Sequence, residues 1–294
     1  MPLRPPENLV FSSGGLRGIA FVPALRELAA AVGGEERLLA GARGLAGSSA
    51  GALIALALTV GLGLDDVATL TDDDHLPEIL PVWVSRRPEL MPATVARVLR
   101  RCGFPASTTF AELRRATGRD LHVAAFAVRR ARSEIFSAGS TPHDLVVDAV
   151  VASAGVGYVR RPTGRVELFL DGGLTLPLPL TVFPLETTLG LYLCGRLAAA
   201  CSHIRFTPAE RSRIIVIRLG AGSSPARHIA ALAAKTAVAT YLQTLGFPPS
   251  TTHSEQWQQQ QQQQQEKPSP CARSAAATWR WSPVKGLSSS GGSP

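Results

Sequence analysis

The sequence of 294 residues contains few cysteines, and the four that it has lie far apart. They form no C-x-x-C pair and have no histidine at metal-ligand spacing, which excludes a disulfide framework and a zinc site. These cysteines are Cys102, Cys194, Cys201 and Cys271. Because the chain also lacks an acidic loop of the calcium-binding type, we expect neither a metal ion nor another cofactor.

Long apolar runs are missing as well. The longest apolar stretches, residues 52–64 and 187–201, fall short of the ~20 residues that cross a bilayer. Residues 1–7 lack the apolar run of a secretory signal. These absences predict a cytoplasmic protein with neither a signal peptide nor a transmembrane helix, whose contact with a membrane would be peripheral and transient.

Lysine is almost absent, so the formal charge of +8 comes nearly all from arginine. The arginine side chain presents a planar fork of donors that suits phosphate, which would fit anionic lipid head groups or nucleic acid. Adjacent arginines occur as scattered pairs, such as Arg86/Arg87 and Arg160/Arg161, and no continuous basic run is present. This pattern favours a compositional bias over a dedicated polybasic site, and we expect no nucleic-acid partner.

Two strand–turn–helix units follow one another at the start of the chain. Residues 8–12 are typical of a short buried strand, and residues 18–32 show helical periodicity after a glycine-rich turn. A second short strand ends at Ala46, before a tight turn and the helix-forming residues 52–59. Successive units of this kind predict a largely parallel sheet in an α/β domain.

Composition divides the chain into three parts. Residues 1–7 form an N-terminal arm, and residues 8–246 are long enough for one α/β domain. Within it, residues 65–116 mix helical segments with prolines and predict a helical insertion. Residues 247–294 contain an unbroken glutamine run and are rich in serine and proline, which predicts a disordered tail. Further strands are expected at 120–128, 165–170 and 214–219, and further helices at 144–152 and 225–245.

A G-x-S-x-G pentapeptide, Gly47-Ser48-Ser49-Ala50-Gly51, lies between the second predicted strand and the helix that follows. This is the context of a nucleophile elbow, in which the serine takes strained backbone angles and a side chain at either glycine would collide with its neighbours. The hydroxyl of Ser49 would then lie at a helix N-terminus, where backbone N–H groups stabilise negative charge. Taken alone, the same small residues would equally allow close packing of a helix on a sheet.

Two further motifs bear on this choice. Ser13-Gly14-Gly15-Leu16-Arg17-Gly18 follows the first strand directly, and its bare backbone amides would suit an oxyanion hole. It matches neither G-x-G-x-x-G nor a loop ending in G-K-[ST], which argues against nucleotide binding. Asp171-Gly172-Gly173 follows the predicted strand at 165–170, where a carboxylate would emerge at the edge of the sheet.

In this order the three motifs resemble the patatin-like phospholipase family, whose pattern is a G-G-G-x-[RK]-G loop, a G-x-S-x-G elbow and a later D-G-[GA]. The resemblance spans residues 8 to about 185 and includes Asp148-Ala149-Val150-Val151-Ala152-Ser153-Ala154, which is similar to the family's D-A-x-x-A-S-x helix. It implies a three-layer α/β/α fold with a largely parallel central sheet and a helical insertion.

The resemblance also implies roles for particular residues. Ser49 would be the nucleophile and Asp171 its partner base, and the amides around Gly14, Gly15 and Leu16 would form the oxyanion hole. The implied activity is that of a lipid acyl hydrolase, either a phospholipase of the A type or an acylglycerol lipase, that works through an acyl-enzyme without a catalytic histidine.

Arg17 matches the family's basic position and would hold an anionic head group or orient the loop. The substrate implied by the resemblance is a phospholipid or an acylglycerol at the surface of a membrane or a lipid droplet. A Ser-His-Asp triad remains an alternative, because His203 and His228 follow Ser49 and Asp171 in the order of an α/β-hydrolase.

The sequence departs from the family pattern at two positions. Ser13 stands where the family usually has its first glycine, and Gly155 follows Ala154 where a proline is common nearby. A serine in place of a glycine would reshape the loop if the position required a backbone angle that only glycine takes freely. The second function class left open by this departure is a catalytically inactive module that binds lipid or a partner.

Overall fold

The computed structural model describes residues 3–70, 90–194, 205–219 and 227–247. The chain divides into two compact units, residues 1–247 and 248–294, and the described residues all belong to the first. The tail expected from residue 247, the middle of the expected helical insertion and His203 lie outside the described residues.

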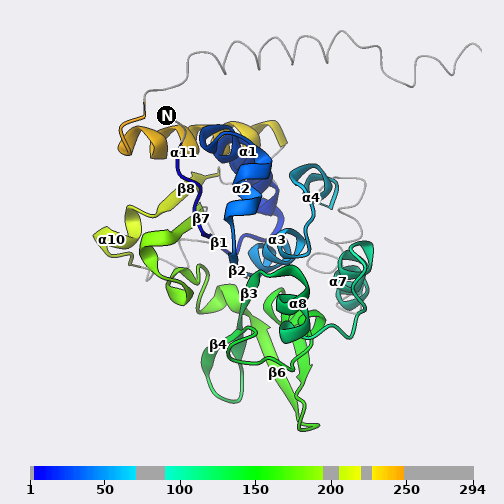
Figure 1. The fold of residues 1–294 in the computed structure, drawn as a ribbon. Coiled ribbons are helices and arrows are strands. Elements are labelled where there is room, and N and C mark those ends of the chain that lie inside the picture. Colours follow the sequence, from blue (N-terminus) through cyan, green and yellow to red (C-terminus); the bar gives the residue numbers. More distant parts are fainter. Residues whose placement is uncertain (1–2, 71–89, 195–204, 220–226, 248–294) are drawn as a thin grey trace, which may run out of the picture. The chain divides into compact units, whose positions relative to one another are not determined.

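Eight strands form one sheet in the order β5-β6-β3-β2-β1-β7-β8, with β4 paired to β3 (Figure 1). Strands β3, β2, β1, β7 and β8 pair with one another in parallel, whereas β4 and β6 pair with β3, and β5 with β6, in antiparallel fashion. The strands are β1 (Asn8–Phe11), β2 (Gly44–Ser48), β3 (Asp120–Ala127), β4 (Arg132–Phe136), β5 (Val156–Arg160), β6 (Val166–Asp171), β7 (Thr188–Cys194) and β8 (Ile214–Arg218).

Helices precede and follow the strands in the order that the sequence predicts. The α-helices of the described residues are α1 (Phe21–Val32), α2 (Glu35–Gly41), α3 (Ala50–Thr59), α4 (Leu64–Leu70), α7 (Leu90–Arg101), α8 (Phe110–Thr117), α9 (Val146–Ser153), α10 (Pro208–Arg211) and α11 (Arg227–Thr244). The 3-10 helices are η1 (Gly15–Ala20), η2 (Gly172–Leu174), η3 (Leu180–Val182) and η4 (Leu185–Thr187). A central sheet flanked by helices confirms the expected α/β class.

The two faces of the sheet bury different side chains. Leu9 and Phe11 point into the larger core, which is formed with α1, α3, α9 and α11. Val10, between them, points into a smaller core on the other face, where it meets Leu178 and Leu180 from the segment around η3. This alternation follows from the two-residue period of a strand, and burial on both faces explains why β1 is an unbroken apolar run.

The register of β3 decides where the motifs meet. β4 pairs with residues 123–127 of β3, a stretch that overlaps the residues paired with β2 (120–124) and those paired with β6 (125–127). Because one edge of a strand can pair with only one neighbour at a given residue, β4 occupies one edge of β3, and β2 and β6 share the other. β2 runs parallel to β3 and ends with Ser48 opposite Ala124, whereas β6 runs antiparallel and ends with Asp171 opposite Ala125. The C-terminal ends of β2 and β6 therefore meet head to head on neighbouring residues of β3.

Candidate active site

Ser49 lies at the turn between β2 and α3, at the N-cap position of the helix, with φ of 58° and ψ of −125°. This backbone conformation is strained for a residue with a side chain and costs about 1–3 kcal/mol. The flanking glycines make the turn possible. A Cβ at Gly47 would collide with the backbone of Gly51 and lie 2.5 Å from Ala52 N, and a Cβ at Gly51 would lie 2.6 Å from Ser12 O. The predicted elbow geometry is present.

Asp171 lies at the junction of β6 and η2, where its carboxylate accepts a hydrogen bond of 2.7 Å from the Gly173 amide. The side chain of Ser49 lies close enough to interact with this carboxylate. Burial raises the pKa of Asp171 to about 6, although the Gly173 amide and the Ser49 side chain favour the charged form. A carboxylate with a pKa close to neutral pH is mostly ionised and yet basic enough to accept a proton.

The glycine-rich loop leads from β1 into η1, close to the elbow. The first hydrogen bond of η1 runs from the Arg17 amide to Gly14 O, at 3.1 Å. The amides of Gly14, Gly15 and Leu16 therefore precede the first bond of the helix, and no side chain caps this end. Gly15 has φ of +53°, which glycine adopts without strain. These three amides are the ones expected to form an oxyanion hole.

Ser13 does not need the backbone freedom of glycine. Among the non-glycine residues that the structure describes, only Ser49 and Ala131 have positive φ. The Ser13 amide donates a hydrogen bond of 2.7 Å to Pro177 O, and its side chain lies so close to Gly173 that a Cβ there would be 2.6 Å from Ser13 Cβ. Position 13 therefore does not require a backbone angle that only glycine takes freely.

Arg17 lies in η1 and is half-buried. The next residue, Gly18, packs against the start of α3, where a Cβ at Gly18 would lie 3.1 Å from Ala50 Cβ. Close packing of η1 on α3 thus brings Arg17 and the loop amides to the N-terminal end of α3, next to Ser49.

One residue of the site, Ser153 at the end of α9, was not predicted from the sequence. Its hydroxyl is fully buried, accepts a hydrogen bond of 2.9 Å from the Ser49 amide and donates one of 2.6 Å to Ala124 O. A single side chain thus joins the elbow to β3. The only sequence signal was the resemblance of residues 148–154 to the family's helix, which assigns Ser153 no role.

The histidines of the triad alternative are differently placed. His228 is exposed at the start of α11, and His203 lies outside the described residues. His122 pairs with Asp120 at 3.4 Å near the opposite end of β3, where Asp120 lies beside the first residue of β2. The described residues contain no group of three or more His, Cys, Asp or Glu that could hold a metal ion.

No helix among the described residues is both long and apolar enough to cross a membrane.

Ser49 is only 1% exposed, although it lies at the end of a strand. Ser48, its neighbour in the pentapeptide, is fully buried, and its hydroxyl has no hydrogen-bond partner. The two adjacent serines thus differ in surroundings, because only Ser49 is linked to a carboxylate.

Two comparisons with known protein sequences relate this chain to others. The model of the family described as patatin-like phospholipase matches residues 9–184. The uncharacterized protein R571 of Acanthamoeba polyphaga mimivirus is 25% identical over an aligned length of 200 residues, and the alignment covers 63% of this chain and 64% of that protein. The chain therefore matches less than two thirds of the length of this relative.

Solved structures share the fold at low sequence identity. VipD from Legionella pneumophila has a TM-score of 0.53 at 15% identity, with 82% of this chain and 67% of VipD covered. The type III effector ExoU has a TM-score of 0.51 at 17% identity, with 83% of this chain and 54% of ExoU covered. ExoU in its heterodimeric complex with SpcU from Pseudomonas aeruginosa has a TM-score of 0.51 at 20% identity, covering 82% and 52%.

Proposed function

The chain belongs to the patatin-like phospholipase family, and on this basis we propose that it is a lipid acyl hydrolase with a Ser49–Asp171 dyad. Its substrate would be the carboxylic ester of a phospholipid or an acylglycerol, met at the surface of a membrane or a lipid droplet. The single observation that carries the proposal is the placement of Ser49, strained at its elbow, beside the buried Asp171 carboxylate, whose charged form the Ser49 side chain favours.

The proposed reaction follows from the positions of these groups. Asp171 accepts the proton of the Ser49 hydroxyl as the oxygen attacks the ester carbonyl. The amides of Gly14, Gly15 and Leu16 stabilise the oxyanion that forms. Asp171 then returns the proton to the departing alcohol, which leaves an acyl-enzyme. Water, deprotonated by Asp171, releases the fatty acid and restores Ser49.

Labelling by a fluorophosphonate probe tests the dyad. We expect the wild-type protein to be labelled and the Ser49→Ala and Asp171→Asn variants to lose labelling. Ser48→Ala is the matched control, because it removes the neighbouring hydroxyl and should leave labelling intact. A His228→Ala or His203→Ala variant that loses labelling as completely as Asp171→Asn would favour a triad instead.

The burial of Ser49 favours one other function, a lipid-binding or partner-binding module without catalysis. In that case the wild-type protein would not be labelled, and lipid binding would persist in the Ser49→Ala variant. Labelling of the wild type together with release of fatty acid from mixed micelles would reject this alternative.

We also propose that Arg17 contacts the head group of the substrate, because η1 brings it to the start of α3. The Arg17→Gln variant should then raise KM for an anionic phospholipid in mixed micelles more than for a zwitterionic one. Equal effects on both lipids would assign Arg17 to the shape of the loop.

A further inference from the structure

Strand β5 presents alternating surfaces, one packed on α9 and one exposed. Gly157 and Val159 are buried, and a Cβ at Gly157 would lie 2.8 Å from Ala152 of α9. Val156 and Tyr158, on the other face, are 58% and 67% exposed. A strand that is buried on one side normally carries polar residues on the other, so an exposed valine and tyrosine here require another explanation.

The apolar surface continues across the neighbouring strands. Val156 pairs with Leu170 of β6, and Tyr158 pairs with Leu168, so these side chains share one face of the sheet. At the two edges of this face, Val166 is 47% exposed and Val128 is 38% exposed. We call the surface formed by these residues the hairpin face: Val128, Val156, Tyr158, Val166, Leu168 and Leu170.

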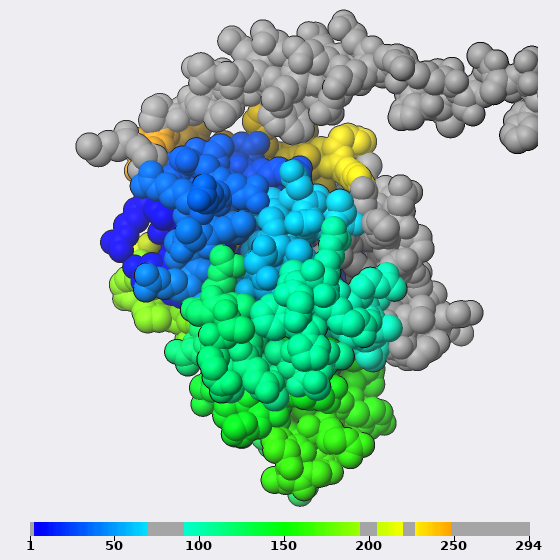
Figure 2. Space-filling view, turned by 45° about the vertical axis from the view of Figure 1, so that its right-hand side comes forward, coloured from blue at the N-terminus to red at the C-terminus, as the bar shows by residue number. Residues whose placement is uncertain are grey.

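The hairpin face lies on the same side of the molecule as the candidate site. β6 reaches the end of β2 only with its last residue, Asp171, so the rest of β6 and its partner β5 extend past the strand end that carries Ser49. Figure 2 shows this hairpin, in bright green, at the lower tip of the described surface. Leu174, three residues after Asp171, is 57% exposed and adds an apolar side chain beside the site.

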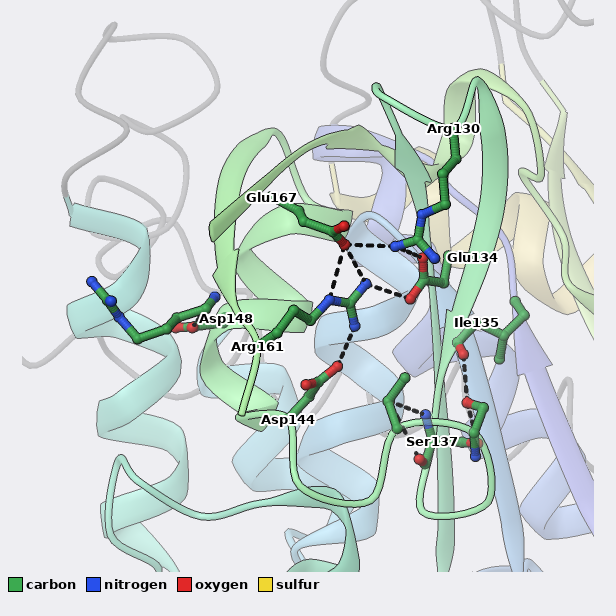
Figure 3. A network of polar contacts seen from close by, with 11 residues as sticks. Arg130, Glu134, Ile135, Ser137, Asp144, Asp148, Arg161 and Glu167 are labelled. Carbon is green, nitrogen blue, oxygen red and sulfur yellow. Dashed lines mark hydrogen bonds and ion pairs between the residues drawn. The ribbon is translucent and has the colours of Figure 1, made fainter. Parts of the chain in front are cut away.

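An ion-pair network braces the other face of the hairpin (Figure 3). The Arg161 guanidinium contacts Asp144, Glu134 at 2.5 Å and Glu167 at 3.0 Å, and Arg130 lies 2.6 Å from both glutamates. Glu167 pairs with the buried Val159, which places it on the side of α9. The acidic groups of this region are therefore neutralised on the face opposite to the hairpin face.

The exposed charges around the hairpin face are positive. Arg129 lies in the turn between β3 and β4, and Arg160 pairs with Val166 on the hairpin face; both are exposed. Arg165 is also exposed but pairs with Glu167 at 3.2 Å. Glu134 and Glu167 are only 13% and 10% exposed and are paired with arginine. An apolar surface with a tyrosine and a rim of arginines suits the boundary of an anionic bilayer, where the apolar groups enter and the arginines meet phosphate.

We propose that the hairpin face docks the protein on an anionic lipid surface. The choice of a lipid surface, and not a protein, rests on the proposed function and on the basic rim. Docking by this face would lay β5 and β6 along the bilayer and hold the end of β6, which carries Asp171, close to it.

Vesicle flotation tests this docking in the Ser49→Ala background, so that the result does not depend on catalysis. Binding should be weak to phosphatidylcholine vesicles and strong when phosphatidylserine is included. Adding Val156→Ser and Tyr158→Ser should weaken binding roughly tenfold or more, because these are the two exposed side chains that would enter the bilayer. Adding Arg160→Gln should weaken it about fivefold, and only with phosphatidylserine.

The matched control is Ile229→Ser with Leu232→Ser, which removes two side chains that are 46% and 67% exposed on α11. It should bind vesicles like the parent, and thermal unfolding should be unchanged in both double variants. Equal binding by the hairpin variant, or an equal loss in the control, would overturn the proposal. So would a dimer of the parent that the hairpin substitutions dissociate while vesicle binding persists. Failure of fluorophosphonate labelling would instead count against the dyad, since flotation does not require it.

Discussion

Replacement of Asp171 by asparagine should make the protein more stable at neutral and alkaline pH while it abolishes labelling. In the folded protein the pKa of Asp171 is raised to about 6 by burial, from 3.8. The folded state thus binds this proton more tightly than the unfolded chain does. The stability linked to Asp171 is fully present below pH 3.8 and is lost as the pH rises through about 6.

The size of the effect follows from the shift. A difference of about two pKa units corresponds to about 3 kcal/mol, the cost of holding the Asp171 carboxylate ionised in the fold. Asparagine carries no charge, so it avoids this cost, and its side-chain oxygen can still accept from the Gly173 amide. We therefore expect Asp171→Asn to raise the free energy of unfolding by up to about 3 kcal/mol at pH 8 and by little below pH 4.

Urea unfolding at a series of pH values from 4 to 8 measures this difference directly. The gain of the variant over the wild type should grow through the interval around pH 6 and then level off. In the same interval kcat/KM of the wild type on a soluble ester should rise and reach a plateau, because the carboxylate form is the base. A variant that is less stable than the wild type at pH 8, or a gain that does not depend on pH, would refute the reasoning.

Three further substitutions test other parts of the structure. Ser153→Ala leaves the Ser49 amide without its buried acceptor. It should lower the free energy of unfolding in urea by about 1–3 kcal/mol, and it should lower kcat more than it changes KM. An unchanged kcat would show that Ser153 does not position the elbow. Gly51→Ala should greatly reduce soluble expression and labelling because its Cβ would meet backbone, whereas Gly155→Ala, with open space around it, should behave like wild type; equal behaviour would contradict the steric argument. Arg161→Met leaves partly buried carboxylates uncompensated and should cost roughly 3 kcal/mol at pH 7 in urea unfolding, and less at pH 4; a neutral effect would show that the network does not brace the hairpin.

Most strands and helices that the sequence predicted are present with shifts of one to three residues at their ends. The helix expected at 144–152 is α9 (Val146–Ser153), and the strand expected at 165–170 is β6 (Val166–Asp171). Strands β4, β5 and β7 were not predicted. β4 and β5 are only five residues long and lie at the edge of the sheet, so their local pattern is weak and pairing with neighbours decides their conformation.

The elbow could be recognised from sequence because its cause is local. Glycine at 47 and 51 is required by atoms within a few residues along the chain or in the adjoining strand, and the pentapeptide records that requirement directly. The loop before η1 could also be recognised from local sequence, because the first amides of any helix have no hydrogen-bond partner within that helix. The sequence left the effect of Ser13 open because its φ depends on the path of the whole loop, which no single residue reveals.

The sequence by itself determined the α/β class and the order of the motifs, and it marked Ser49 and Asp171 as the candidate pair. Only the tertiary structure decided that β2 and β6 share one edge of β3, so that Ser49 and Asp171 meet. The raised pKa of Asp171, the link through Ser153 and the exposed hairpin face likewise arise from contacts between segments far apart in the chain. Steric requirements within a turn involve neighbouring residues and therefore appear as a sequence motif. Burial and strand register depend on contacts throughout the fold, so no short motif indicates them.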